Sequence, residues 1–250
     1  NKKLIDFTST IFVSNIGHSN SNFIRDVKKT LESQPSHTYN YYHSNRLKYS
    51  RDLIKFINNK KLNKCYLLSS GSEATEASLK LMRLYGTKLK KNKDKKGVIA
   101  LKGNWHGRTM GAQMMSGNNK QSAWVGFHDK NIYHLDFPNP WEVDENNSEE
   151  FFYKSLNRTF KKKFNYSQKI CGFILEAFQG WGALFYPLNY IKAIKKFCKK
   201  NKIIITIDEM QSGFGRTGYK FLHEYYNLNP DIMCCGKAMG SGIPISGVIS

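Results

Sequence analysis

The clearest pattern in the chain is an alternation of short apolar runs with longer amphipathic stretches, and it begins at Cys65. Continuous apolar runs of this length are typical of strands buried on both faces, as in a parallel sheet. The strands predicted in this way cover residues 65–68, 98–101, 132–135, 170–175, 203–207 and 232–235, with a further strand beginning at 245.

The stretches between the apolar runs have the spacing of amphipathic helices. Helices are predicted over 73–89, 149–164 and 189–200. The apolar stripe expected on the first helix consists of Ala74, Ala77, Leu81, Leu84 and Tyr85. Alternating strands and helices predict an α/β fold, with a mainly parallel sheet and helices on both of its faces.

The first 60 residues have a different pattern. Residues 4–13 alternate weakly and predict a strand or hairpin, whereas 21–33 and 46–58 have helical spacing. Residues 37–43 are aromatic and polar, and we expect a loop there that covers another part of the molecule. The chain therefore divides into an N-terminal segment, 1–60, and an α/β domain, 61–250.

Composition narrows the class of protein. Hydrophobic residues make up 40% of the 250, which is the range of a folded globular protein. No apolar run approaches the roughly 20 residues that cross a bilayer, so we expect no membrane span. The five cysteines are odd in number and lie mostly in apolar runs, which favours reduced packing residues, no metal site and a cytoplasmic location.

The net charge of +20 raises the alternative of a nucleic-acid-binding protein. The lysines are scattered through Lys/Asn-rich patches such as 88–96, 161–163 and 199–202. No recognised nucleic-acid-binding motif accompanies them, so we interpret the charge as a solvated surface. A nucleotide-binding protein is also disfavoured, because the G-x-G-x-x-G pattern is absent after the first strand.

Unusual polar groups follow five of the predicted strands. In a parallel sheet, ligands bind outside the carboxyl ends of the strands, so these groups are expected to share one edge. The groups are Ser70-Gly71-Ser72, Trp105 to Arg108, Glu176, Asp208 and Lys237.

The chemistry of these groups suggests one kind of ligand. Gly71 and Ser72 open a helix, where free N–H groups favour a phosphate, although Ser70 and Glu73 also fit an ordinary capping box. Trp105 is either a core residue or a flat surface for a heteroaromatic ring. Asp208 can pair with a protonated ring nitrogen, and Lys237 can condense with an aldehyde. Together these features describe pyridoxal 5'-phosphate.

Five motifs resemble, in order and spacing, the class-III pyridoxal-phosphate aminotransferases, which include the ornithine, acetylornithine and 4-aminobutyrate enzymes. They are Ser70 to Ala74, Trp105 to Thr109, Glu176 to Gly180, Asp208 to Gly218 and Gly236 to Gly240. The resemblance covers essentially the whole chain. It implies the fold-type-I sheet, a homodimer with shared active sites, and transfer of an amino group from an amino acid or ω-amine to a 2-oxo acid.

The resemblance also implies individual roles. Lys237 is then the Schiff-base lysine and proton shuttle, and Asp208 the partner of the ring nitrogen. Gln211 lies near the ring hydroxyl, and Glu176 helps to hold Gln211 or the ring region. The remaining roles are the phosphate loop for Gly71 and Ser72, ring stacking for Trp105, a substrate carboxylate for Arg108, and either a cofactor contact or a structural position for His106.

Two departures from the family pattern limit these implications. Many amine-specific members carry an acid two places after the Gln of Glu-x-x-Gln-Gly, where this chain has Trp181. The family also continues beyond the point where this chain stops, into the rest of the large domain and a C-terminal small domain. A decarboxylase or racemase on the same fold, and an inactive fragment, therefore remain alternatives.

Overall fold

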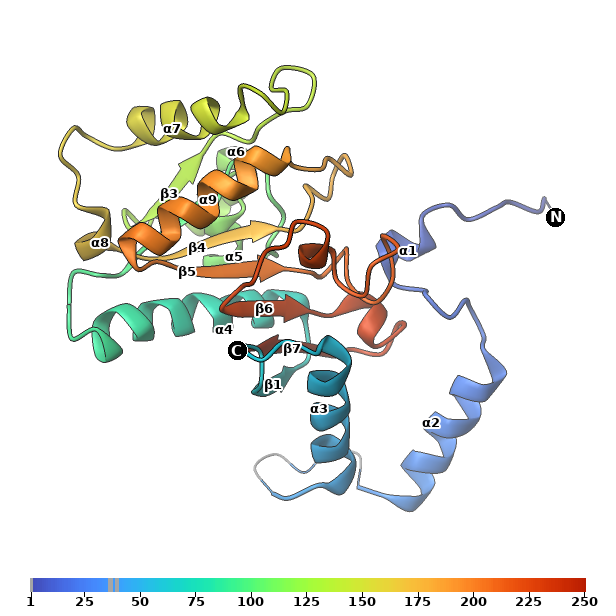
Figure 1. The fold of residues 1–250 in the computed structure, drawn as a ribbon. Helices are drawn as coiled ribbons and strands as arrows, with labels where there is room; N and C mark the ends of the chain where they lie inside the picture. Colours follow the sequence, from blue (N-terminus) through green and yellow to red (C-terminus); the bar gives the residue numbers. More distant parts are fainter. Residues whose placement is uncertain (1, 36–37, 39–40) are drawn as a thin grey trace.

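A single seven-stranded sheet forms the centre of the protein (Figure 1). The computed structural model describes residues 2–35, 38 and 41–250. Its strands are β1 Cys65–Leu68, β2 Gly97–Leu101, β3 Ile132–Leu135, β4 Ile170–Glu176, β5 Ile204–Asp208, β6 Ile232–Cys235 and β7 Ser246–Ile249. The strand order is β1-β7-β6-β5-β4-β2-β3. From β3 to β6 neighbouring strands are parallel, whereas β7 pairs antiparallel with both β6 and β1.

Helices cover both faces of this sheet, as the sequence predicts. The longer ones in the domain are α4 Gly71–Leu84, α7 Ser148–Thr159 and α9 Leu188–Asn201, with shorter α5 Met110–Met115, α6 Asn119–Ser122 and α8 Tyr166–Lys169. Successive side chains of a strand point to opposite faces. Accordingly, Ile99 and Phe173 pack in the same apolar cluster as α7 and α9, whereas Val98 and Ile174 pack with α4 and α5.

Helix α4 differs from its prediction in its limits and in its buried face. It begins at Gly71 and ends at Leu84, and a π-helical turn follows over Tyr85–Leu89. Leu81 and Leu84 are 37% and 40% exposed, so the predicted apolar stripe is wrong at these positions. The helix instead buries Ala74, Thr75, Ser78, Leu79 and Met82. The small polar members of this face allow a neighbouring loop to approach closely and form hydrogen bonds.

The N-terminal segment holds α1 Ser9–Phe12, α2 Ser21–Ser33 and α3 Ser44–Ile57. The predicted strand or hairpin over 4–13 is wrong, because this stretch has no strand to pair with. All four residues of α1 have positive φ angles, which describes a left-handed turn. Asn15 Nδ2 ties the segment to the carbonyl of Phe214 over 3.1 Å. Of the loop predicted over 37–43, residues 37, 39 and 40 lie outside the described part.

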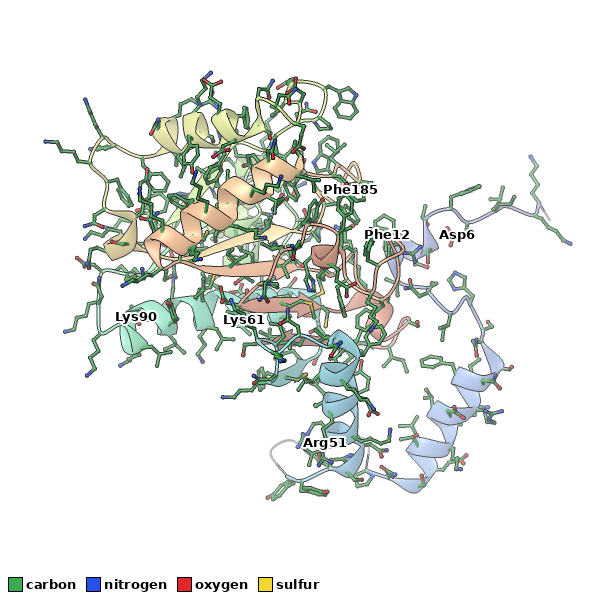
Figure 2. All side chains as sticks on the ribbon, viewed as in Figure 1. Asp6, Phe12, Arg51, Lys61, Lys90 and Phe185 are labelled. Carbon is green, nitrogen blue, oxygen red and sulfur yellow. The ribbon has the colours of Figure 1, made fainter. Side chains whose placement is uncertain are left out.

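Helix α2 lies away from the sheet, between α1 and α3 of this segment (Figures 1 and 2). None of its residues is buried, although its apolar side chains share one face as the periodicity predicts. The neighbouring α3 buries Leu53 and Ile57 and contacts the edge strand β1. The first 35 residues therefore contribute little to the core of the domain.

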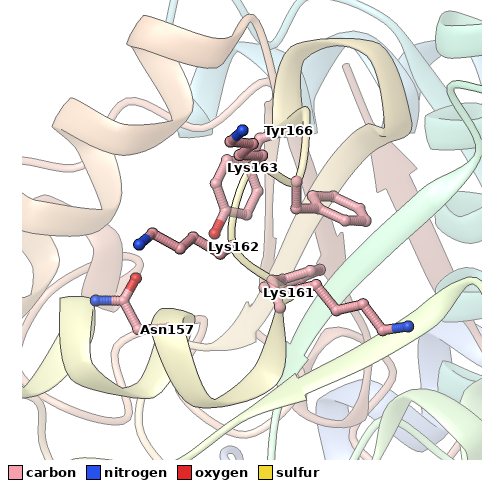
Figure 3. Close-up of a pocket in the computed structure, with 7 residues that line it drawn as sticks. Asn157, Lys161, Lys162, Lys163 and Tyr166 are labelled. Atoms are coloured by element: carbon pink, nitrogen blue, oxygen red, sulfur yellow. The ribbon is translucent and has the colours of Figure 1, made fainter.

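Helix α7 ends at Thr159, five residues before its predicted limit, because the chain turns to pack aromatic rings on the sheet edge. Phe160 and Tyr133 have ring centroids 4.7 Å apart, and the Phe164 ring packs at a tilt against Phe160, with centroids 4.6 Å apart. The pocket beside these rings is bordered by three consecutive lysines, 161–163, whose ammonium groups point in different directions (Figure 3). They do not converge on a common anion, which agrees with a solvated basic surface.

The described residues contain neither a candidate membrane helix nor a candidate metal centre. No helix in this part of the chain combines the length and apolar character that crossing a membrane requires. No group of three or more His, Cys, Asp or Glu side chains is placed to hold a metal ion there.

The core around α7 provides a test of the packing. Phe152 is fully buried and lies 5.5 Å from the Tyr190 ring and 5.6 Å from the Phe197 ring. We expect Phe152→Ala to lower the free energy of unfolding by about 3–5 kcal/mol, measured by urea denaturation, because the cavity cannot collapse. The control Phe127→Ala removes a ring that is 58% exposed. It should change stability by no more than about 0.5 kcal/mol; equal losses in the two variants would contradict this packing.

Candidate active site

The polar groups predicted at the strand ends do meet at one edge of the sheet. They surround a cavity of about 210 Å³ that lies outside the ends of β5 and β6. Its lining consists of Ser70, Gly71, Ser72, Trp105, His106, Gly107, Asp208, Met210, Gln211 and Lys237. Of the predicted site residues, only Glu176 and Arg108 are outside this lining, and both contact residues within it.

The first turn of α4 forms one wall of the cavity. The capping box is real, since Ser70 Oγ accepts from Glu73 N at 3.3 Å and Glu73 Oε2 accepts from Ser70 N at 2.8 Å. Among the described residues, no hydrogen bond uses the N–H of Gly71 or Ser72. The cap therefore uses the N–H groups of Ser70 and Glu73. The N–H groups of Gly71 and Ser72 stay free at the positive end of a 14-residue helix. The two interpretations, cap and phosphate loop, are compatible.

The loop that carries Trp105 is packed directly on this turn. Gly107 has φ +128°, and a Cβ there would lie 2.3 Å from Ser72 Oγ, so only glycine fits. Thr75 Oγ1 donates to the carbonyl of His106 over 2.6 Å. Further along, Glu76 Oε1 accepts from Thr109 Oγ1 and from Gly111 N, both at 2.7 Å. Helix α4 thus fixes the part of the loop that follows Trp105.

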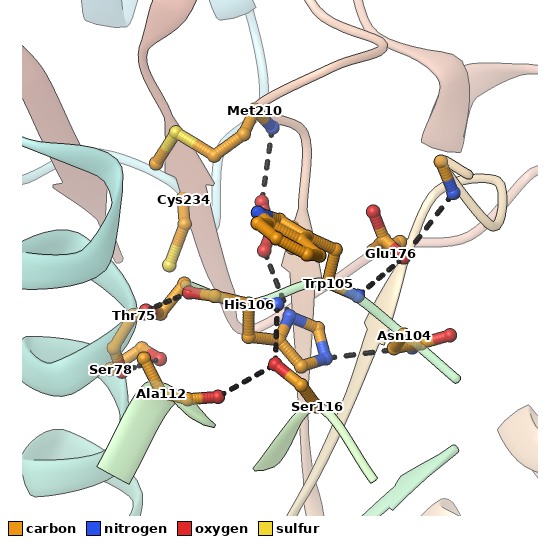
Figure 4. A network of polar contacts seen from close by, with 12 residues as sticks. Thr75, Ser78, Asn104, Trp105, His106, Ala112, Ser116, Glu176, Met210 and Cys234 are labelled. Carbon is orange, nitrogen blue, oxygen red and sulfur yellow. Dashed lines mark hydrogen bonds and ion pairs between the residues drawn. The ribbon is translucent and has the colours of Figure 1, made fainter. Parts of the chain in front are cut away.

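Asp208 lies at the bottom of the cavity, at the end of β5, and is 2% exposed. Its Oδ2 is 2.8 Å from His106 Nδ1, and its Oδ1 accepts from Met210 N at 3.0 Å (Figure 4). Sequence reasoning left His106 between a functional and a structural position. The structure places this imidazole directly on the acid that the sequence predicts to be functional.

Glu176 stands beside Asp208, as its register partner across β4 and β5. Its carboxylate accepts from Trp105 N at 2.9 Å, Gly180 N at 3.3 Å and Gln211 Nε2 at 2.9 Å. Burial, and secondarily the charge of Asp208, raise the pKa of Glu176 to about 8, although these three donors oppose the shift. Glu176 therefore links three segments of the site, and the contact with Gln211 agrees with its expected role.

Lys237 follows β6 and reaches the cavity from the opposite side. It has φ +46°, a left-handed conformation that is uncommon for a residue with a side chain. Burial lowers the pKa of its ammonium group, while the negative charges of Asp208 and Glu176 act in the opposite direction. An amine with a lowered pKa is more readily available as a nucleophile.

Trp105 and Arg108 form the outer part of the site. The Arg108 guanidinium lies 4.5 Å from the centre of the Trp105 ring, a cation–π contact that occupies one face of the indole. Arg108 is exposed, and the structure does not bring it into the cavity lining. Trp181 is 70% exposed, and its indole N–H donates to Gln179 Oε1 over 2.8 Å.

Sequence reasoning missed two residues of the polar network, Asn104 and Gln179. Both are 2% exposed, and Gln179 Nε2 donates to the carbonyl of Lys102 over 2.9 Å. Gln179 lies inside the Glu176 to Gly180 motif, so its position in the motif was an available signal. No pattern in the sequence distinguished Asn104 from an ordinary loop residue.

The residues present fit pyridoxal phosphate on structural grounds. The free N–H groups of Gly71 and Ser72 suit its phosphate, and Trp105 supplies an aromatic surface for its ring. Asp208, held by His106 and by Met210 N, presents a carboxylate that can pair with a protonated ring nitrogen. Lys237 borders the same cavity with a depressed pKa.

Comparison with known proteins agrees with this fit. A family model described as aminotransferase class-III matches residues 1–250. The mitochondrial acetylornithine aminotransferase of Candida glabrata is 35% identical, over 100% of this chain and 56% of its own length. The acetylornithine aminotransferase of Caldanaerobacter subterraneus subsp. tengcongensis is 30% identical, over 98% of this chain and 57% of its own.

A solved structure shares the fold. A PLP-bound amine transaminase from an uncultivated Pseudomonas species superposes with a TM-score of 0.87, covering 98% of this chain and 57% of that one. At 22% identity it bears on the fold alone. The predicted fold-type-I sheet is thereby confirmed.

The chain belongs to the class-III aminotransferase family. The expectation of pyridoxal phosphate as the cofactor is confirmed at the level of this family. The chain spans a little over half the length of the acetylornithine aminotransferases that it matches.

The carboxyl group of Glu176 provides a pH test. Its folded-state pKa is raised to about 8, so the folded protein binds a proton that the unfolded chain releases at lower pH. Stability should therefore fall as pH rises from about 5 to about 8, by up to about 1.4 kcal/mol for each unit of pKa difference. In Glu176→Gln this part of the slope should vanish, whatever the offset in stability. Urea denaturation at several pH values measures both slopes; parallel slopes would contradict the raised pKa.

Proposed function

We propose that this chain is the cofactor-binding part of a pyridoxal-phosphate-dependent aminotransferase. The enzyme would transfer an amino group from an amino acid or ω-amine to a 2-oxo acid. The observation that carries the proposal is the meeting of Lys237, Asp208, Trp105 and two free helix N–H groups around one cavity. Each element alone has an ordinary structural explanation, but their convergence does not.

The bound cofactor would supply an aldehyde that condenses with amines and a ring that withdraws electron density. Lys237, which borders the cavity and has a lowered pKa, is proposed as the residue that holds the aldehyde carbon and carries protons. Asp208 is proposed to keep the ring nitrogen protonated through its buried carboxylate. His106 and the N–H of Met210 hold that carboxylate in position.

The other proposed contacts follow from the walls of the cavity. Gly71 and Ser72 are proposed to bind the phosphate through their N–H groups, and Trp105 to stack on the ring. Gln211, held by Glu176 at 2.9 Å, is proposed to lie near the ring hydroxyl. Arg108 is proposed for a substrate carboxylate; its guanidinium is exposed and anchored on Trp105, at the outer side of the site.

Domain organisation and assembly are part of the proposal. We assign 61–250 to the cofactor-binding domain and 1–60 to an appended segment, since the described part of residues 1–35 has no buried side chain. A homodimer with shared active sites is proposed because Ser70 and Arg108 leave the site exposed on one side. A reducing compartment such as the cytoplasm is proposed because all five cysteines are free and four are buried.

Substitution of Lys237 tests cofactor binding. Whole protein supplied with pyridoxal phosphate should show a visible absorbance band that Lys237→Ala abolishes, because no other amine borders the described cavity. The matched control is Lys162→Ala, which removes an exposed lysine beside a distant pocket and should leave the band unchanged. Persistence of the band in Lys237→Ala would reject the assignment.

Dependence on an amino acceptor tests the reaction. Amino donors, including ornithine derivatives and ω-amines, are screened with 2-oxoglutarate or pyruvate. We expect the corresponding amino acid to form in proportion to the donor consumed, and no turnover without acceptor. Release of carbon dioxide or racemisation in the absence of acceptor would instead identify a different pyridoxal-phosphate reaction.

A further inference from the structure

A chain of hydrogen bonds runs from the surface of the protein to Asp208. It begins at Trp181, a residue that is 70% exposed, and ends at Asp208, which is 2% exposed. The four links are Trp181 Nε1 to Gln179 Oε1 at 2.8 Å, Gln179 Nε2 to Asn104 Oδ1 at 3.4 Å, Asn104 Nδ2 to His106 Nε2 at 3.5 Å, and His106 Nδ1 to Asp208 Oδ2 at 2.8 Å.

The outer end of this chain has a fixed direction. An indole nitrogen can only donate a hydrogen bond, and a backbone carbonyl can only accept one. Gln179 contacts one of each, because its Oε1 faces Trp181 and its Nε2 faces the carbonyl of Lys102 at 2.9 Å. The amide of Gln179 therefore has one orientation that satisfies both partners, with its NH₂ group directed inward.

The orientation of the Gln179 amide determines the hydrogen bonding of the His106 imidazole. The NH₂ group of Gln179 donates to Asn104 Oδ1, which turns the NH₂ group of Asn104 toward His106 Nε2. Because an amide NH₂ only donates, Nε2 must accept and carries no proton. In the neutral ring the proton then lies on Nδ1, from which it is donated to Asp208.

The surroundings hold these groups at the required positions. The backbone N–H of His106 donates to Ser116 Oγ at 2.9 Å, and the backbone carbonyl of His106 accepts from Thr75 Oγ1 (Figure 4). Gly103 has φ +77°, and a Cβ there would lie 3.1 Å from Gln179 Nε2. A larger residue at this position would press on the amide that sets the direction of the chain.

We propose that Trp181 and Gln179 are positioning residues that, through Asn104, fix the Nδ1–H tautomer of His106 and so direct its proton at Asp208. The carboxylate of Asp208 then accepts one hydrogen bond from His106 Nδ1 and one from Met210 N. Trp181, although it lies at the surface, then influences Asp208 at the floor of the cavity through this chain of hydrogen bonds. The consequence for catalysis rests on the proposed function, whereas the tautomer itself does not.

The test reads the tautomer directly in the cofactor-free chain. Histidine labelled with ¹⁵N distinguishes protonated from unprotonated ring nitrogens by NMR, and the His106 signals are identified by their loss in His106→Asn. In the unaltered chain we expect Nδ1 protonated and Nε2 unprotonated. Trp181→Phe, which removes only the indole N–H, should lower the tautomer preference by about fivefold, the equivalent of one net hydrogen bond.

A matched control and a second variant complete the experiment. Trp141→Phe alters an indole that is 77% exposed and should leave the His106 signals unchanged. Asn104→Asp places an acceptor against Nε2, so both ring nitrogens should become protonated. An unchanged tautomer preference in Trp181→Phe would overturn the proposal, as would an Nε2 that stays unprotonated in Asn104→Asp. Because no cofactor is added, failure of the aminotransferase assignment would not affect these signals.

Discussion

Two buried carboxylates at neighbouring strand ends impose the main constraint on this structure. Glu176 and Asp208 are register partners on β4 and β5, and each is 3% exposed or less. Charges placed in this way are costly unless donors surround them. The donors come from backbone N–H groups at Trp105, Gly180 and Met210 and from the side chains of His106 and Gln211. The loops at this edge therefore have conformations that direct hydrogen-bond donors at Glu176 and Asp208.

The two acids are held by different kinds of partner. Glu176 is held by backbone and amide donors, and burial raises its pKa to about 8. Asp208 has an imidazole on one oxygen and a backbone N–H on the other. Glu176 thus joins segments of the chain together, whereas Asp208 faces the cavity. Burial lowers the pKa of Lys237, whereas the charge of Asp208, and that of Glu176 when it is ionised, raise this pKa and so oppose the effect of burial.

Helix α4 shows how one element serves both folding and the site. Its capping box satisfies Ser70 and Glu73 and leaves the N–H groups of Gly71 and Ser72 free. Its buried face contains Thr75, whose hydroxyl holds the carbonyl of His106. A helix with a wholly apolar face could pack on the sheet but could not fix this loop. Because this partly polar face of α4 packs against the domain, Leu81 and Leu84 on another face are exposed.

Much of the fold could be predicted because buried parallel strands need continuous apolar runs. The runs at 132–135 and 232–235 coincide with β3 and β6. The left-handed turn at Ser9–Phe12 could not be predicted, because its contacts are with residues some 200 positions away, such as Arg216, which donates to Ser9 Oγ. The early end of α7 likewise depends on aromatic packing against Tyr133, on another element.

The sequence by itself determined the sheet, the common edge of its strand ends and the residue types gathered there. These follow from local periodicity and from the geometry of parallel strands. The tertiary structure alone decided which groups touch. It placed His106 on Asp208, kept Arg108 outside the cavity lining, and joined Trp181 to the cavity floor through Gln179 and Asn104. Hydrogen bonds depend on distances of tenths of an ångström between loops, and no local pattern encodes them.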